Sequence, residues 1–109
     1  MCGICGIFHY RDHERSADRQ LVYAMADLMR ARGPDDAGEY FDGPLGLGFR
    51  RLSIVDLTPT GHQPMCDETG RLWLVLNGEI YNAPQLRTEL LGRGHKMKSA
   101  GDAEIVLHL

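Results

Sequence analysis

The chain has 109 residues, the size of one small domain, and its 43% hydrophobic and 25% charged residues are typical of a globular protein. The net charge of −3 gives no electrostatic basis for binding nucleic acid or an anionic membrane surface. The longest apolar runs, LWLVL and IVLHL, are too short to cross a bilayer, and no signal peptide opens the chain. Three cysteines without a secretory signal indicate free thiols in a reducing cytoplasm, so we expect a cytoplasmic protein.

A strand and then a helix are predicted near the N-terminus. Residues 3–8 (GICGIF) are small and apolar, which is typical of a buried strand. Residues 19–31 show apolar side chains at helical spacing, and Asp18 or Ser16 can cap this helix. The apolar face of the helix is predicted to comprise Leu21, Met25 and Leu28.

Strands separated by loops are predicted in the middle of the chain. Residues 38–42 follow a segment rich in turn formers and should form a strand. Residues 45–57 should form either a strand pair or one long strand. Residues 58–71 have the composition of a surface loop, and residues 71–82 (RLWLVLNGEIYN) are expected to form a buried strand that runs into a turn.

Two helices are predicted toward the C-terminus. Asn82 is a good cap for the first, with Pro84 in its first turn and Leu86 and Leu90 on one face. Asp102 can cap the second, which continues as an apolar run to the end of the sequence. A helix of about two turns is marginal in water without tertiary packing. We therefore expect the chain to be an N-terminal piece of a longer protein, cut inside a helix.

Cys2 is the first candidate for a chemical role, because it becomes the N-terminal residue once Met1 is removed. A thiol with a pKa of about 8.5 needs a base at neutral pH. The α-amine, with a pKa of about 7.7–8.0, can be that base within the same residue. While Met1 is attached, this base does not exist. The alternative role for Cys2 is that of a small apolar side chain at the chain end.

The dipeptide Asn77-Gly78 has two interpretations, which are compatible with each other. Asn-Gly is the strongest short signal for a two-residue hairpin turn. An asparagine side chain and a glycine N–H can also form the oxyanion hole that a nucleophile needs when it attacks an amide. Glu79 then supplies a carboxylate able to hold a substrate ammonium group.

Arg50 and Arg51 are adjacent on a predicted strand. Because neighbouring residues on a strand point to opposite faces, one of the two should face inward. A buried arginine is costly unless it pairs with an anion, and a substrate carboxylate would be such an anion. The alternatives are a structural salt bridge and a solvated sheet edge.

Five blocks of sequence together resemble the class II, N-terminal-nucleophile glutamine amidotransferases, and among them the asparagine synthetase family. The blocks are MCGICGIF, RGPDDAG, RRLSIVDL with GHQPM, NGEIYN and SAGDAE, in the family's order over nearly the whole chain. The chain departs from the family's pattern in the last block. There Gly101 and Ala103 flank Asp102, where the family usually has Ser or Thr before the acid and Thr or Cys after it.

The resemblance implies a catalytic role for three residues. Cys2 is similar to the nucleophile that attacks the side-chain amide of glutamine, with its own α-amine as the base. Asn77 and the N–H of Gly78 resemble the oxyanion hole. Ammonia leaves, a glutamyl thioester remains on Cys2, and water then releases glutamate.

The resemblance also implies three substrate-binding residues and no metal ligand. Arg51 matches the arginine that binds the α-carboxylate of glutamine, with backbone groups of residues 52–55 lining the same pocket. Glu79 and Asp102 match the acids that hold the α-ammonium group. By charge matching alone, a zwitterionic amino acid requires one cation and one or two anions, which Arg51, Glu79 and Asp102 provide.

The fold implied by the resemblance is α+β, as part of the four-layer α-β-β-α sandwich of N-terminal-nucleophile hydrolases. Residues 1–109 would be the N-terminal portion of the amidotransferase domain, without the synthetase domain. Glutamine hydrolysis needs no cofactor, whereas ATP and Mg²⁺ belong to that synthetase domain. It would use the ammonia to amidate a carboxylate such as aspartate. The implied partners are glutamine, the synthetase domain and, in the full-length protein, a second copy in a homodimer.

Other functions are compatible with parts of the sequence. Cys2, Cys5, His62 and Cys66 offer three thiolates and one imidazole, an acceptable set for a small Cys3His zinc module. A thioredoxin-like role for Cys2-x-x-Cys5 is disfavoured, because the strand before and the helix after the motif are absent. A truncated fragment that folds or binds without turnover is the remaining alternative.

Overall fold

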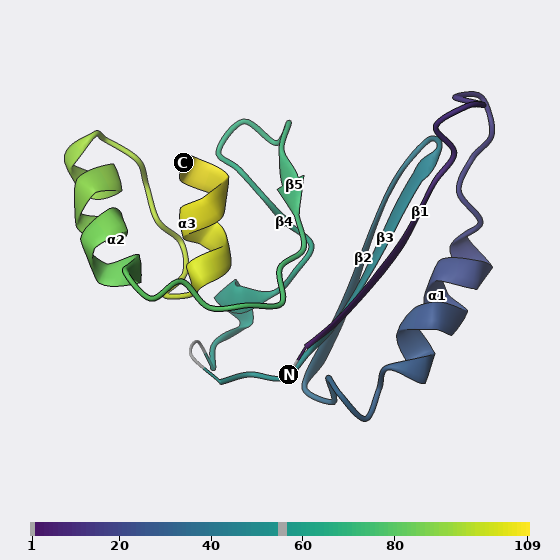
Figure 1. The fold of residues 1–109 in the computed structure, drawn as a ribbon, viewed down its shortest axis with the longest axis horizontal. Helices are drawn as coiled ribbons and strands as arrows, with labels where there is room; N and C mark the ends of the chain where they lie inside the picture. Colours follow the sequence, from purple (N-terminus) through teal and green to yellow (C-terminus); the bar gives the residue numbers. More distant parts are fainter. Residues whose placement is uncertain (1, 55–56) are drawn as a thin grey trace.

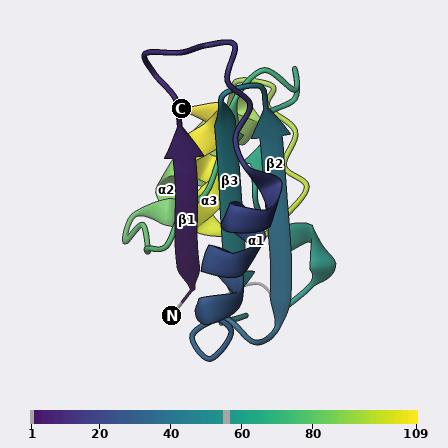
Figure 2. The same cartoon turned by 90° about the vertical axis from the view of Figure 1, so that its right-hand side faces the viewer.

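The first half of the chain forms an antiparallel sheet with one helix on its face. The computed structural model describes residues 2–54 and 57–109. The strands are β1 (Gly3–Phe8), β2 (Asp36–Asp42) and β3 (Leu45–Arg51), in the order β1-β3-β2. Helix α1 (Arg19–Leu28) lies across one face of this sheet (Figure 2).

The second half forms a short strand pair and two helices. It begins with a 3₁₀ turn, η1 (Pro59–Gly61). The strands of the pair are β4 (Met65–Cys66) and β5 (Trp73–Leu74). The helices that follow are α2 (Ala83–Gly92) and α3 (Asp102–His108). Across Figure 1 the succession is α1, the three-stranded sheet, the β4–β5 pair, then α3 and α2. The rings of Tyr40 and Trp73 stack with centroids 3.9 Å apart and so connect β2 with β5. The prediction of a mixed α+β fold is confirmed.

Helix α1 contacts the sheet through a different face from the one predicted. Val22 is fully buried and packs on Gly48 of β3. A Cβ atom added at Gly48 would lie only 3.1 Å from the Val22 Cγ1. Leu21 and Leu28 are exposed instead. The predicted face and the face that carries Val22 both have helical spacing. The glycine-lined surface of β3 favours close approach of Val22, which is smaller than leucine and β-branched. Asp18 caps the helix as predicted, since its Oδ1 accepts a hydrogen bond from the Leu21 N–H at 3.2 Å.

The predicted strands at residues 3–8 and 38–42 are confirmed, but β1 is not buried. Ile4 and Phe8 are 47% and 56% exposed, and by strand alternation they lie on the face of β1 opposite Cys5, away from α1. Of residues 45–57, only 45–51 form a strand, and it is one strand rather than a pair. Residues 55–56 lie outside the described residues.

Two predictions for residues 58–82 are wrong in part. Residues 58–71 do not form only a surface loop, because Gly61, Gln63 and Pro64 are buried. Residues 71–82 do not form a buried strand either. Only Trp73–Leu74 are paired, in β5, and Trp73 is 37% exposed.

Gln63 holds the chain segment that follows β5. Its buried side chain receives a hydrogen bond at Oε1 from the Leu76 N–H (2.6 Å), and its Nε2 donates to the Leu76 carbonyl oxygen (3.4 Å). On the other side, a Cβ atom on Gly38 of β2 would lie 1.9 Å from the backbone oxygen of Gln63. Only a glycine at position 38 lets Gln63 pack this closely against the sheet.

Replacing Gly38 by alanine is expected to lower the free energy of unfolding of the full chain by about 1–3 kcal/mol, because the added methyl group has no space beside the Gln63 backbone. Denaturant unfolding measures the loss. Gly92→Ala is the matched control, since a Cβ atom there meets nothing within 4 Å and the residue is helical. That variant should be neutral or more stable by up to about 1 kcal/mol. An equal loss in both variants would contradict the packing described.

The predicted helices toward the C-terminus are confirmed, with one change of cap. Asn82 occupies the N-cap of α2, although its side chain makes no capping hydrogen bond, and Leu90 is buried. Gly94, with a φ of 92°, adopts the left-handed conformation that ends α2. Gly101 rather than Asp102 is the N-cap of α3, so Asp102 is the first helical residue. Within the described ranges, no helix is long and apolar enough to cross a membrane.

Candidate active site

One pocket of about 380 Å³ collects residues from five separate segments of the chain. These are the start of β1, the end of β3, the segment from η1 to β4, the segment after β5 and the N-terminal end of α3. All of the residues predicted to act on a substrate line it, namely Cys2, Arg51, Asn77, Gly78, Glu79 and Asp102. Leu52 and Ile54 line it too, as expected for the backbone after Arg51. We refer to it as the Cys2 pocket.

Cys2 is placed at the pocket by the pairing of β1 with β3. Gly3 pairs with Arg50 in an antiparallel register, so that Cys2 extends the ladder opposite Arg51. The Leu52 N–H donates to the Cys2 Sγ at 3.4 Å, and the Sγ lies 3.6 Å from the Leu52 carbonyl oxygen. The half-buried thiol is thus fixed by backbone groups at the end of β3.

Arg51 is the inward-facing member of the arginine pair. It is 7% exposed, and its Nη1 donates to the Thr58 carbonyl oxygen at 2.6 Å. The guanidinium packs against Gly61, where a Cβ atom would lie 2.2 Å from Nη2. Arg50 points to the other face of the sheet and donates from Nε to the Gly33 carbonyl oxygen at 2.9 Å. The prediction that one arginine faces inward is confirmed.

The segment that carries Asn77, Gly78 and Glu79 is not a hairpin turn. Among the described residues no strand follows Gly78 before α2, and none other than glycine has a positive φ, which a type I′ turn would require of Asn77. The segment is held at both ends instead. Gln63 binds the backbone of Leu76 on one side, and Asp102 binds the next segment on the other.

Asp102 connects α3 with the segment after Glu79. Its Oδ2 accepts a hydrogen bond from the Ile80 N–H at 2.6 Å. The carboxylate therefore lies beside Glu79 in the Cys2 pocket, at the positive end of the helix. Gly101 and Ala103, which flank it, also line the pocket.

Glu104 fixes the turn that precedes α3. It is 4% exposed, and its carboxylate accepts hydrogen bonds from the backbone N–H groups of Lys98 and Ser99 (both 2.6 Å) and from the Ser99 Oγ (2.7 Å). Burial alone would raise the pKa of the Glu104 carboxyl. The hydrogen bonds from Ser99 and Lys98 outweigh burial, so the pKa lies below its ordinary value.

Gln63 and Glu104 are positioning residues that were not predicted from the sequence. Both lie inside blocks that resemble the family, GHQPM and SAGDAE. Each is a buried polar side chain that binds backbone groups of a segment leading into the Cys2 pocket. The signal available for Gln63 was the apolar pair Pro64-Met65 directly after it, in a segment otherwise typical of a loop.

The charges of the Cys2 pocket match a small zwitterion. Arg51 supplies one positive charge to the lining, and Glu79 and Asp102 supply two negative charges. The Cys2 thiol adds a nucleophile, so the arrangement can bind a small molecule that carries both charges and attack it.

The four residues of the Cys3His alternative are not brought together in the part of the chain that the structure describes. The Cys5 Sγ lies on the α1 side of the sheet, 3.8 Å from the Val22 carbonyl oxygen. Burial raises the pKa of the Cys5 thiol, although a hydrogen bond with the Gly48 backbone opposes this. His62 pairs with Asp36, and Cys66 is exposed on β4.

Comparisons with known proteins show the family of the chain. A family model described as "Glutamine amidotransferase domain" matches residues 1–109. The chain is 40% identical over 108 residues to asparagine synthetase [glutamine-hydrolyzing] 1 of Bacillus subtilis, an alignment that covers 98% of this chain and 17% of the relative. It is 38% identical to asparagine synthetase [glutamine-hydrolyzing] 2 of the same species, over 100% of this chain and 14% of the relative.

A plant relative gives the same result. The chain is 36% identical over 109 residues to asparagine synthetase [glutamine-hydrolyzing] 1 of Arabidopsis thaliana. This alignment covers 100% of this chain and 18% of the relative. The chain thus spans less than a fifth of the length of these curated relatives. Since the family model matches it from end to end, the chain belongs to the class II glutamine amidotransferase domain family.

Proposed function

We propose that this domain hydrolyses the side-chain amide of glutamine. The observation that carries the proposal is the convergence of Cys2, Arg51, Asn77, Glu79 and Asp102 on one pocket from four segments of the chain. They supply a thiol, a guanidinium and two carboxylates to the lining of that one pocket. Together they match the parts of one zwitterionic amide.

In the proposed mechanism the Cys2 thiol attacks the amide carbon of glutamine. The α-amine of Cys2 takes the thiol proton and transfers it to the departing nitrogen, which leaves as ammonia. The Asn77 side-chain NH₂ and the Gly78 N–H donate hydrogen bonds to the oxyanion that forms. Water then attacks the glutamyl thioester, with the same amine as base, and releases glutamate and the free thiol.

Binding of the substrate is assigned to the charged residues of the Cys2 pocket. Arg51 holds the α-carboxylate, while Glu79 and Asp102 hold the α-ammonium group. Because Asp102 Oδ2 already accepts from Ile80, its Oδ1 is the atom assigned to the ammonium group. The hydrolysis requires no metal or cofactor beyond these groups.

We further propose that the ammonia serves an ATP-dependent synthetase domain, which amidates a carboxylate such as that of aspartate. The proposal rests on the relatives, whose names describe asparagine synthetases that hydrolyse glutamine. ATP and Mg²⁺ would bind in that domain. The order of layers, with helix α1 and helices α2 and α3 outside two sheets, supports placement of this chain in a four-layer α-β-β-α sandwich (Figure 1).

The test of the proposed function is release of glutamate from L-glutamine by the full chain. We expect hydrolysis of L-glutamine and none of D-glutamine, because Arg51 and the two acids fix the α-carbon substituents in one arrangement. Hydrolysis of neither enantiomer would support the non-catalytic alternative. Equal hydrolysis of both would contradict the substrate contacts.

Insertion of one residue between Met1 and Cys2 is expected to abolish glutamine hydrolysis, since Cys2 then has no free α-amine to act as base. Glutamate release measures the loss, and in the full-length protein, where the synthetase domain is present, turnover with added ammonia should be unchanged. Mass spectrometry of the unaltered protein should show that Met1 has been removed. If the insertion variant hydrolyses glutamine at the original rate, the α-amine is not the base.

A further inference from the structure

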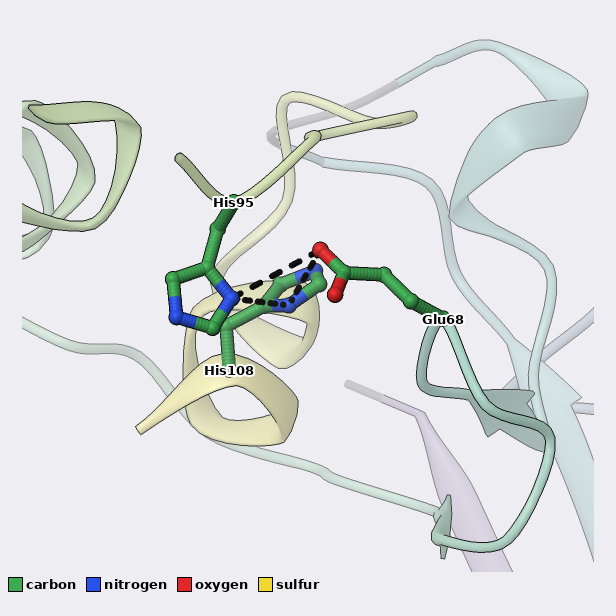
Figure 3. A group of neighbouring side chains, drawn as sticks. All are labelled: Glu68, His95 and His108. Carbon is green, nitrogen blue, oxygen red and sulfur yellow. Dashed lines mark hydrogen bonds and ion pairs between the residues drawn. The ribbon is translucent and has the colours of Figure 1, made fainter. Parts of the chain in front are cut away.

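Three side chains outside the Cys2 pocket converge on one point. They are Glu68 in the β4–β5 connection, His95 after α2 and His108 in the last turn of α3 (Figure 3). The two Nδ1 atoms lie 3.2 Å apart, and Glu68 Oε1 lies 3.5 Å from His95 Nδ1 and 3.4 Å from His108 Nδ1. We call these residues the Glu68–His95–His108 cluster.

The spacing of the three atoms matches one face of a tetrahedral metal site. Zinc lies about 2.0–2.1 Å from histidine nitrogens and at a similar distance from carboxylate oxygens. Tetrahedral angles then place neighbouring ligand atoms about 3.3–3.5 Å apart. The three measured separations, 3.2, 3.4 and 3.5 Å, fall at or close to this range. Two imidazoles and one carboxylate are also a ligand set that zinc uses in proteins.

The surroundings hold each side chain in place. The Lys96 N–H donates to Glu68 Oε1 at 3.0 Å, which orients the carboxylate toward the two rings. The side chain of His108 is 4% exposed, and its other nitrogen, Nε2, lies 3.6 Å from the Glu104 carboxylate. A carboxylate behind the second nitrogen of a ligating histidine is the usual arrangement at zinc sites, because it selects the tautomer with a free lone pair on the metal side.

The cluster is open to solvent on one side. The side chains of Glu68 and His95 are 43% and 31% exposed, so an ion can enter and a water molecule can occupy the fourth position. No short spacing motif joins the three residues, because they come from separate segments. Their meeting depends on the packing of α3 against the β4–β5 pair.

We propose that the Glu68–His95–His108 cluster binds a divalent transition-metal ion of the zinc class, with solvent as the fourth ligand. Nitrogen ligands favour such an ion over Mg²⁺ or Ca²⁺. None of the three residues lines the Cys2 pocket, so the site is separate from the proposed hydrolysis of glutamine. The ion would join the β4–β5 connection to the C-terminal turn of α3, whose first turn carries Asp102.

The test is titration of the metal-free full chain with Zn²⁺, followed by calorimetry, with Co²⁺ absorption as a second measurement. We expect one equivalent of bound Zn²⁺, a higher melting temperature with Zn²⁺, and a tetrahedral Co²⁺ spectrum without thiolate bands. His95→Gln and Glu68→Gln should each weaken binding by about 100-fold or more, since even residues behind the ligands contribute about 10- to 100-fold. Both side chains are partly exposed, so these variants are chosen to avoid the buried His108.

His13→Gln is the matched control, because His13 is exposed and lies outside the cluster. It should bind Zn²⁺ as tightly as the unaltered chain. The proposal is overturned if the chain binds no Zn²⁺ at micromolar concentration, if both cluster variants bind as tightly as the control, or if Co²⁺ shows thiolate bands. The first result would leave the cluster as a hydrogen-bonded group of two imidazoles and a carboxylate.

Discussion

Replacing Cys2 by alanine is expected to reduce glutamine-dependent turnover of the full-length protein, with its synthetase domain present, by about 10⁴-fold or more, because the step that forms the thioester has no other nucleophile. Turnover with added ammonia should be unchanged, since free ammonia bypasses the hydrolysis. Among the residues that line the Cys2 pocket, Cys2 is the only cysteine. Paired assays with glutamine and with ammonia as nitrogen source measure the two activities.

Cys66→Ala is the control for this substitution. Cys66 is exposed on β4 and is absent from the residues that line the Cys2 pocket, so both activities should be retained. An equal loss of glutamine-dependent and ammonia-dependent turnover in Cys2→Ala would show that the substitution damages the whole protein. That result would remove the support for Cys2 as the nucleophile.

Replacing Arg51 by alanine is expected to raise the KM for glutamine by about 100-fold or more, with a much smaller change in kcat. A charge-assisted contact to the α-carboxylate is present in both the bound substrate and the transition state, so its loss weakens both equally. Steady-state kinetics with glutamine separate the two parameters. Arg51→Lys should lie between the original protein and Arg51→Ala, because a lysine keeps the charge but not the paired hydrogen bonds.

Arg51 also makes a structural contact within the protein. The Arg51→Lys variant helps to separate the effect of losing that contact from the effect of losing substrate binding. Its Nη1 donates to the Thr58 carbonyl oxygen, and the alanine variant loses that bond. Thermal unfolding of both variants shows how much stability is lost. Arg50→Ala is the control, because Arg50 faces α1 and binds Gly33, so its KM should be unchanged. A raised KM in Arg50→Ala and none in Arg51→Ala would move the carboxylate site to the other arginine.

The positions of helices and strands could be predicted where their signals are local. The capping carboxylate of Asp18 marks the start of α1. The side of α1 that packs could not be predicted, because Val22 and Leu21 both belong to apolar stripes and only the sheet surface selects between them. Residues 71–82 were expected to be a buried strand because they are apolar, yet only Trp73–Leu74 pair with another strand among the described residues.

The candidate site was more predictable than the packing around it. Its chemistry follows from residue types and family blocks, and the meeting of Cys2 with Arg51 follows from the register of β1 with β3. The predicted hairpin turn at Asn77-Gly78 is wrong for a tertiary reason. The side chain of Gln63 binds the backbone of Leu76, which a hairpin would have paired with the opposite strand. The Glu68–His95–His108 cluster had no sequence signal, because three separate segments contribute one ligand each.

We propose that Cys2 carries the glutamyl group during hydrolysis. This proposal is tested most directly with a glutamine analogue that has an electrophilic carbon in place of the side-chain amide. After incubation with the full chain, digestion and mass spectrometry identify the cysteine that has been modified. Cys66, which is exposed, reports non-specific reaction, and Cys5, whose pKa is raised by burial, should react slowly.

We expect one equivalent of the analogue on Cys2, formed faster than any adduct on Cys66 and slowed by excess L-glutamine but not by D-glutamine. Modification of Cys66 or Cys5 at the rate of Cys2, or modification of Cys2 that L-glutamine does not slow, would contradict the proposal.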